Sequence, residues 1–492
     1  MAALSLLPLA YIAGYTADVG WSGVRELVLR PRVAELLWNT GRLVLGTVAV
    51  CAVLGVGAAW LVQRSSLPAR RVWHVLMVAP LAVPAFVNSY AWISLLPGVD
   101  TYAGALLVVS LSYFPFVYLP VAAAFQGLDP ALEETARGLG LSDRAVFLRV
   151  QLPQLRVALL GGSLLVALHL LAEFGALQML RYPTFTTAIY DQYRATFNGP
   201  AATMLAGVLV LLCLVLLLAE LRLRGVRGYA RTGRGAARPG RPVALGRATV
   251  PALVALGALA AAALGVPLWA LAYWMVRGAS TTLDAAALAT TTGSTLALAA
   301  VAAVVVTGLA VAPGWLAVRA RGRVSTLLER STYLGSGVPG IVVALALVTL
   351  SIRATPWLYQ TVPVLVAAYA VLFLPRAVVT VRAAVEQSPR LLDEVAASLG
   401  STALDRLRRV TLPLLAPGLG AGAALVFLAV VTELTATLLL APTGTTTLAT
   451  AFWSASGALE YGAAAPYAVV MVLLSAPAAV LLSSDVRRGL IP

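Results

Sequence analysis

Long apolar stretches separated by short polar segments run along most of the chain. Stretches of about 20 residues with few charges predict transmembrane helices. Such stretches lie at roughly 40–62, 73–96, 102–126, 157–180, 201–221, 250–276, 291–317, 332–352, 357–381, 416–440 and 462–483. Residues 4–17 are also apolar, and because no Arg precedes them as in the n-region of a signal peptide, we expect a short first span. The pattern predicts an all-α membrane protein with about 12 transmembrane helices.

One polar segment, residues 222–248, is long enough to divide the chain. It is rich in Arg, Gly and Pro and holds eight arginines: Arg222, Arg224, Arg227, Arg231, Arg234, Arg238, Arg241 and Arg247. Such a composition cannot bury a core and predicts a flexible linker between a first half, 1–221, and a second half, 249–492. Nucleic-acid-binding proteins also carry Arg-rich segments. A segment between apolar spans is better explained as a cytoplasmic connector, so we expect no nucleic-acid partner.

Charged residues are few and unevenly placed. Only 11% of the residues are charged and 60% are apolar, which excludes a disordered chain and disfavours a soluble enzyme. All 35 basic residues are Arg, and the net charge is +15. With the N-terminus inside, the inner segments are about 63–72, 127–156, 222–249, 318–331, 376–415 and 484–492, and they hold 27 of the 35 arginines. The positive-inside rule then places both termini in the cytoplasm.

The sequence gives little support to hydrolytic or metal chemistry. A chain without Lys cannot carry a P-loop, whose Lys contacts the nucleotide phosphates. Cys51 and Cys213 lie in apolar runs, and His74 and His169 are too few for an HExxH-like metal motif. We therefore expect no catalytic residues, no metal site and no cofactor on this chain.

Two predicted inner loops, about 128–156 and 386–416, repeat one pattern at an offset of 260 residues. The first reads EETARGLGLSDRAVFLRVQLPQLR and the second DEVAASLGSTALDRLRRVTLPLLAP. The matched residues are Glu134 and Glu394, Ala136 and Ala396, Gly140 and Gly400, and Pro153 and Pro413. The duplication predicts two homologous six-span halves in the same orientation, since an even number of spans returns the chain to the same side.

The repeated pattern, E-x-A-x3-G-x9-(V/I)-x-L-P, resembles the EAA motif of the permeases of ABC importers, with Thr135 in place of the usual first Ala of the first copy. The resemblance implies a type I ABC importer-like fold of two pseudo-symmetric six-helix halves, each with a cytoplasmic coupling helix. It also implies two copies of a cytoplasmic ABC ATPase subunit, which would carry ATP and Mg, and an extracytoplasmic substrate-binding protein. The resemblance would also place the protein in the inner membrane of a prokaryotic cell, in contact with lipid.

The fused twelve-span layout is most similar to the ferric-iron permeases, and next to the thiamine permeases. The resemblance therefore implies a binding-protein-dependent transport permease for ferric iron, with thiamine or another small solute as the alternative. A secondary transporter with parallel repeats is the rival class, because it shares the layout of two six-span halves. The duplicated loop favours the ABC permease, since a secondary carrier has no ATPase subunit to contact.

The residues of the loops support a coupling role. Residues 130–139 and 389–399 contain good helix formers with acids near their starts, and each is followed by a Gly that can end a helix in a left-handed turn. Pro153 and Pro413 fit the start of the next element. We expect a short amphipathic helix in each loop, with Leu132, Ala136 and Leu139 on one side of the first and Glu133 and Arg137 on another.

Two acids, Glu173 and Glu433, lie in apolar runs at matched positions. Acids within spans are costly, so both are candidates for the translocation path or its outer gate, as is His169 one helical turn before Glu173. The alternative is equally open: each acid is satisfied near the interface or by backbone groups. A His–Glu pair at such a place is more often structural than a ligand site.

Overall fold

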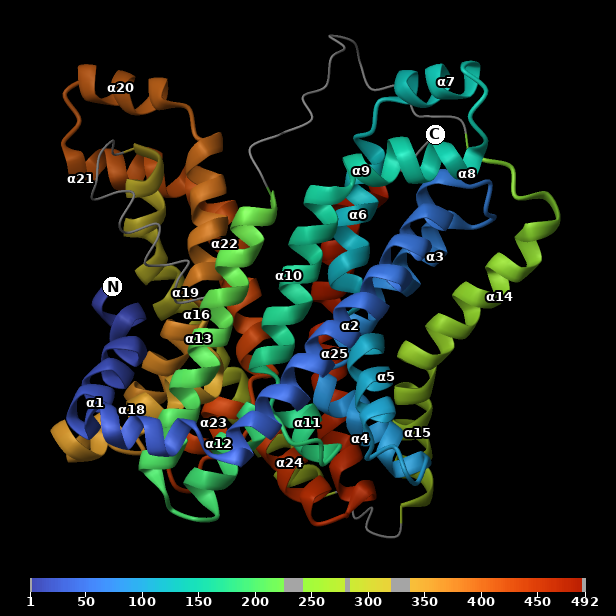
Figure 1. Cartoon of the computed structure of the whole chain (residues 1–492). Coiled ribbons are helices and arrows are strands. Elements are labelled where there is room, and N and C mark those ends of the chain that lie inside the picture. Colours follow the sequence, from blue (N-terminus) through green and yellow to red (C-terminus); the bar gives the residue numbers. More distant parts are fainter. Residues whose placement is uncertain (1, 225–241, 279–283, 320–336, 489–492) are drawn as a thin grey trace. The chain divides into compact units, whose positions relative to one another are not determined.

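The computed structural model describes residues 2–224, 242–278, 284–319 and 337–488 (Figure 1). Most of the described residues are helical. Among the described residues the one β-type pairing is the isolated bridge between Ser65 and Val243, and no strand forms. Apolar composition and the absence of competing strand patterns explain this all-helical outcome, as the sequence predicts. The Arg-rich linker prediction falls largely on 225–241, outside the described residues.

Six described helices are long and apolar enough to cross a membrane, or up to nine if each of three bent helix pairs is one span. Predicted span 73–96 is broken: Arg70–Ala82 and Ala85–Leu95 meet at 91°, where Pro80 and Pro84 interrupt the helix. Helix α1 (Ala2–Val28) contains the predicted first span 4–17 and is longer than expected, with a non-helical Gly20. The helices agree with a multi-pass membrane protein.

The chain forms two compact units, which we describe separately. Unit 2 consists of Leu29–Asp191, Leu211–Thr281 and Leu459–Pro492. Its centre is a trio in which α2 packs on α6 and α10, while α4 packs on α11 and α15. Its helices are α2 (Pro31–Arg64), α3 (Arg70–Val78), α4 (Ala85–Leu95), α5 (Tyr102–Tyr113), α6 (Pro115–Gln126), α7 (Pro130–Gly138), α8 (Asp143–Val146), α9 (Leu152–Gln154), α10 (Arg156–Ala172), α11 (Gly175–Met179), α14 (Thr249–Ala260), α15 (Val266–Arg277) and α25 (Tyr461–Arg488).

Unit 1 consists of Met1–Val28, Gln192–Val210 and Thr282–Ala458. It repeats the same packing: α16 packs on α19 and α22, and α18 packs on α23. Its described helices are α1, α16 (Ala285–Arg319), α18 (Gly340–Ala354), α19 (Val362–Gln387), α20 (Arg390–Ser398), α21 (Ala403–Arg406), α22 (Leu412–Val431), α23 (Thr435–Leu440) and α24 (Leu448–Gly457). Helices α12 (Phe185–Arg194) and α13 (Gly199–Arg224) contribute residues to both units.

The two compact units do not contain the same helices as the two halves of the sequence. Helix α1 belongs to the first half of the sequence, yet it packs on α18 in unit 1. Conversely, α14 and α15 begin the second half and belong to unit 2, where α15 packs on α4. The first helix of each sequence half is therefore part of the compact unit built mainly from the other half.

Two matched glycines bring the helices of each trio into close contact. A Cβ on Gly162 of α10 would come within 2.8 Å of the Phe116 carbonyl oxygen on α6. A Cβ on Gly422 of α22 would come within 2.5 Å of the Thr380 hydroxyl on α19. These glycines have ordinary helical backbones, so their function is to let two helices approach, as small residues do in membrane bundles.

Candidate functional site

The first repeated loop contains helix α7, which begins and ends with ordinary capping chemistry. The Asp129 carboxylate accepts a hydrogen bond from the Ala131 amide at 3.0 Å, and Pro130 occupies the first turn. At the other end the Gly140 amide donates to the Arg137 carbonyl (2.9 Å) and the Leu141 amide to the Ala136 carbonyl (3.1 Å). This Schellman pattern requires the left-handed backbone that Gly140 adopts, with φ 85°.

The second repeated loop ends its helix in the same way. The Gly400 amide donates to the Ala397 carbonyl at 3.0 Å, and the Ser401 amide donates to the Ala396 carbonyl at 3.1 Å. Gly400 has a φ of 80°. The helices predicted at 130–139 and 389–399 are confirmed as α7 and α20, and so are the two left-handed glycine turns. Both loops hold their helix with one geometry, although most of their side chains differ.

After each glycine the chain re-enters a helix through a new cap. Ser142 accepts from the Ala145 amide at 3.4 Å, and Thr402 accepts from the Asp405 amide at 3.2 Å. A π-helical turn follows in both loops, over Phe147–Gln151 and Leu407–Thr411. Pro153 and Pro413 then occupy the first turn of α9 and α22, where their missing amide is not needed. The structure thus confirms that each proline begins the next element.

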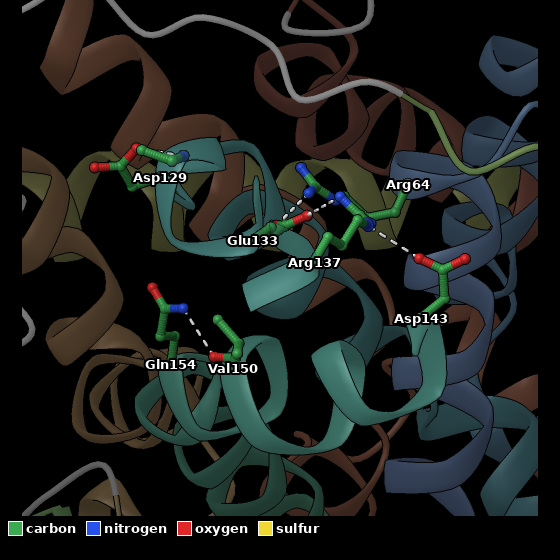
Figure 2. Close-up of polar contacts among 8 residues, drawn as sticks. Arg64, Asp129, Glu133, Arg137, Asp143, Val150 and Gln154 are labelled. Carbon is green, nitrogen blue, oxygen red and sulfur yellow. Dashed lines mark hydrogen bonds and ion pairs between the residues drawn. The ribbon is translucent and has the colours of Figure 1, made fainter. Parts of the chain in front are cut away.

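A buried ion pair fixes α7 to the end of α2 (Figure 2). Arg64, the last residue of α2, binds the Glu133 carboxylate, and both side chains are buried. Glu133 also lies 3.9 Å from Arg137, whose Nε donates to Asp143 at 2.9 Å. Loss of one partner of a buried pair leaves an uncompensated charge, so the pair holds α7 in position. No local sequence signal points to Arg64, because its partner lies 69 positions away.

The second loop is held by a different contact, which lies just before its helix rather than on it. Arg319, the last residue of α16, donates from Nη2 to the carbonyl oxygen of Ser388 at 2.9 Å. Ser388 is the C-cap of α19 and directly precedes the α20 loop. In each unit, therefore, an Arg at the end of the first long helix of the trio holds the start of the repeated loop.

The structure adds to the prediction for α7 which of its residues are buried. Ala136 is buried with Glu133, whereas Leu132 and Leu139 are exposed, so the three apolar residues do not share one buried side. The physical reason is the Arg64–Glu133 pair, which turns the Glu133 side of the helix inward. Glu134 and Glu394 are exposed and Ala396 is half-buried. Each loop therefore presents its Glu and several apolar side chains outward.

Glu173 lies where the predicted span 157–180 is broken. Helix α10 ends at Ala172, and Glu173 is its C-cap. The Glu173 carboxylate accepts from the Ala176 amide at 2.8 Å, and therefore caps the N-terminus of α11. It also accepts a hydrogen bond from the Tyr113 hydroxyl at 2.5 Å. These contacts satisfy an acid in an otherwise apolar region.

Glu433 occupies the matched break between α22 and α23. Its carboxylate accepts from the amides of Ala436 (2.9 Å) and Thr437 (3.0 Å) and from the Thr437 hydroxyl (2.8 Å). A Cβ on Gly340, the first residue of α18, would lie 3.6 Å from Oε1, so the carboxylate also lies beside the start of α18. Each acid caps a helix. Both are also half-buried, so each keeps some accessible surface.

The neighbours of the His169 ring include two aromatic rings. Its ring centroid is 4.4 Å from that of Phe116 and 6.1 Å from that of Tyr113, and Nδ1 lies 2.9 Å from the Leu165 carbonyl oxygen. Tyr113 thus connects the two predicted residues, since it contacts His169 and donates to Glu173. In the described residues no three His, Cys, Asp or Glu side chains are grouped as a metal site would need.

Comparison with known proteins matches both halves to one family. Residues 52–224 and 304–484 each match the family of the binding-protein-dependent transport system inner membrane component. The chain is 37% identical to the Fe(3+)-transport system permease protein FbpB 2 of Haemophilus influenzae, over 95% of this chain and 93% of that protein. It is 28% identical to the sulfate transport system permease protein CysT of Escherichia coli, over 43% of this chain and 84% of that protein. It is 29% identical to the sulfate transport system permease protein CysW of Synechocystis, over 35% of this chain and 70% of that protein.

Proposed function

The chain belongs to the family of binding-protein-dependent transport system inner membrane components, and on that premise we propose that it is the fused permease subunit of an ABC importer. Two matched coupling loops carry this proposal. Each presents a short helix outward, ended by a left-handed glycine and anchored by an Arg of its own unit. A transport subunit of this kind performs no chemistry; ATP and Mg would be bound by the partner ATPase subunits.

Ferric iron is the cargo that we propose. The supporting observation is the 37% identity over nearly the whole chain with a protein named as an Fe(3+)-transport permease. Glu173 and Glu433 would also suit a cationic cargo near the outer gate, since both keep accessible surface beside their helix caps. Thiamine, which is also cationic, is the alternative within the same mechanism.

Binding energy at the two ends of the bundle would operate the importer. An extracytoplasmic binding protein would deliver the cargo, and two copies of a cytoplasmic ATPase subunit would contact α7 and α20. Closure of the ATPase pair would then move each coupling helix. Because α7 is joined to α2 by the Arg64–Glu133 pair and leads along the chain through α8 and α9 to α10, that movement would reach α2 directly and α10 through the chain.

The proposed orientation places both termini and both coupling loops in the cytoplasm of a prokaryotic cell. The support is the arginine distribution, since the inner segments hold most of the arginines. In Figure 1, α7 and α8 lie at the end of unit 2 opposite α11, and α20 and α21 lie at the end of unit 1 opposite α23. Each unit therefore has a coupling end and a helix-break end.

Reconstitution tests the proposal and its rival together. The permease, the ATPase subunit and the binding protein are placed in proteoliposomes, and uptake of radiolabelled ferric iron is followed with and without ATP. We expect uptake only with all three components. Uptake that persists without the ATPase subunit would show a secondary transporter, and ATP-driven uptake of thiamine instead of iron would reassign the cargo. A matched control omits only the binding protein.

A further inference from the structure

One charged residue lies deep within a membrane-spanning helix and has no place in the mechanism above. Helix α19 runs from Val362 to Gln387 as one apolar helix of 26 residues. At 1.5 Å per residue, Arg376 lies roughly 21 Å from its start and roughly 17 Å from its end. Arg376 lies where the predicted span 357–381 and the predicted inner segment 376–415 overlap, and the helix continues for three turns beyond it.

Arg376 lies on the single open face of this helix. Between Val364 and Val385 only Arg376, Val379 and Ala383 are exposed, and they are spaced three and four residues apart. Residues at such spacing share one side of a helix. The remaining residues of this stretch are buried or half-buried by the rest of the protein.

The matched helix of unit 2 opens the same face. Subtracting the repeat offset of 260 gives Phe116, Leu119 and Ala123 on α6, which are half-buried, half-buried and exposed. Two copies of one helix thus leave the same face accessible, each within its own unit. The residues differ, because unit 2 has the Phe116 ring packed against His169 where unit 1 has Arg376.

An Arg at this depth cannot face hydrocarbon. Charged side chains within membrane spans face the bundle interior or a water-filled cavity, where partners or water can solvate them. The Arg376 guanidinium lies over the Phe373 ring, 5.3 Å from its centroid, and in the part of the chain that the structure describes no acid pairs with it. The face formed by Arg376, Val379 and Ala383 is therefore a water-facing surface with an uncompensated positive charge.

We propose that this face of α19 lines the translocation path and that Arg376 contacts an oxyanion group of the cargo as it crosses. The planar guanidinium presents paired N–H donors that fit a carboxylate, phosphate or similar oxyanion, and the Phe373 ring leaves those donors available. A bare ferric ion would be repelled by this charge. Resting on the proposed function, the inference is that ferric iron crosses with an anionic ligand rather than as the free cation.

Charge-selective labelling tests the site without any assumption about the cargo. Val379→Cys is made in the full permease, where the native thiols are silent because Cys51 and Cys213 are buried. The reagents are an anionic and a cationic methanethiosulfonate, added to the assembled importer. We expect labelling of Cys at 379 with preference for the anionic reagent, and Arg376→Gln should lower that preference roughly tenfold, as one charge at about 6 Å in water predicts.

The controls use neighbours on the same helix. Val381→Cys, at a fully buried position, should not be labelled. Arg382→Gln should leave the preference unchanged, because Arg382 is paired with Glu386 at 2.9 Å. If Val379→Cys impairs assembly, Ala383→Cys replaces it. Absence of labelling at both positions, or a preference that Arg376→Gln does not alter, overturns the inference.

Double-label uptake then identifies the ligand. The binding protein is loaded with labelled ferric iron together with labelled citrate, or with labelled phosphate, and ATP-driven uptake is measured in proteoliposomes. We expect one anion to enter with the iron, and Arg376→Gln to reduce iron uptake at least tenfold, with Arg376→Lys between the two. Iron entry without either anion at an unchanged rate in Arg376→Gln refutes the inference alone. ATP-driven uptake of sulfate but not iron would refute the ferric function while supporting the oxyanion contact.

Discussion

The two coupling helices present surfaces of different apolarity at the same four positions. On α20 the exposed residues are Leu391, Leu392, Val395 and Leu399, and on α7 they are Ala131, Leu132, Thr135 and Leu139. The two sets differ at the first and third positions. The proposed ATPase subunit is the same protein at both helices, so we expect it to bind α20 more tightly than α7.

The difference can be estimated from the exposed area. A leucine in place of alanine adds three carbons, and a valine in place of threonine exchanges a hydroxyl for a methyl. Leu391 is 66% exposed and Val395 45% exposed, so about half of each side chain remains to be buried by a partner. At about 0.8 kcal/mol per buried carbon the two positions together contribute about 2 kcal/mol, or roughly 30-fold in affinity.

Exchange of the two residues tests this reasoning. The double variant Leu391→Ala with Val395→Thr gives α20 the surface of α7, and Ala131→Leu with Thr135→Val makes the reverse change. Titration of the ATPase subunit onto the permease in nanodiscs should show a tight and a weak site in the wild type. We expect two weak sites in the first variant and two tight sites in the second.

The matched control is Leu459→Ala, which removes the same carbons from an exposed position before α25. It should leave both affinities unchanged. Two equal sites in the wild type, or a tight site that persists in the Leu391→Ala, Val395→Thr variant, would show that these side chains do not set the strength of docking.

The sequence predicted the coupling loops well because their structure depends on local signals. A helix of nine residues ended by a left-handed glycine needs only its own caps and backbone, so the pattern around Gly140 and Gly400 was sufficient. The Arg64–Glu133 pair was not predictable in the same way. It joins residues that only the packing of α2 against α6 and α10 brings together.

The helix breaks show where hydropathy is insufficient. A single acid in an apolar run changes the mean hydropathy little, so 157–180 and 416–440 each looked like one continuous span. The carboxylates of Glu173 and Glu433 instead accept backbone amides of the next short helix, which is how a chain can interrupt a helix away from water. These breaks become visible only when each backbone donor and acceptor is assigned its partner, which requires the three-dimensional structure.

Arg376 lies where two predictions overlap. The apolar pattern included it in the span 357–381, whereas the positive-inside rule counted it with the inner segment 376–415. The helix continues because the residues around Arg376 are buried on every face but one. The net charge of +15 is thus mainly a property of the inner segments, but at least one arginine belongs to the membrane-spanning part.

Three further substitutions test how the loops and the breaks are held. Gly140→Val and Gly400→Val place a β-branched residue in the left-handed region, at a cost of about 1–2 kcal/mol, and we expect loss of ATPase-subunit association in pull-downs while membrane insertion is unchanged. Arg64→Ala leaves the buried Glu133 charge unpaired and should lower the free energy of unfolding by about 3 kcal/mol in thermal melts, whereas removal of the exposed Arg32 should have a far smaller effect. Glu433→Ala removes the acceptor of two amides and should destabilise the protein by about 1–3 kcal/mol per amide, while Glu433→Gln keeps an acceptor oxygen and most of the stability. Uptake by the stable Glu433→Gln variant then decides the role of the acid: a large loss of transport shows that its charge contacts a cationic cargo, and wild-type transport shows that Glu433 is only a helix cap.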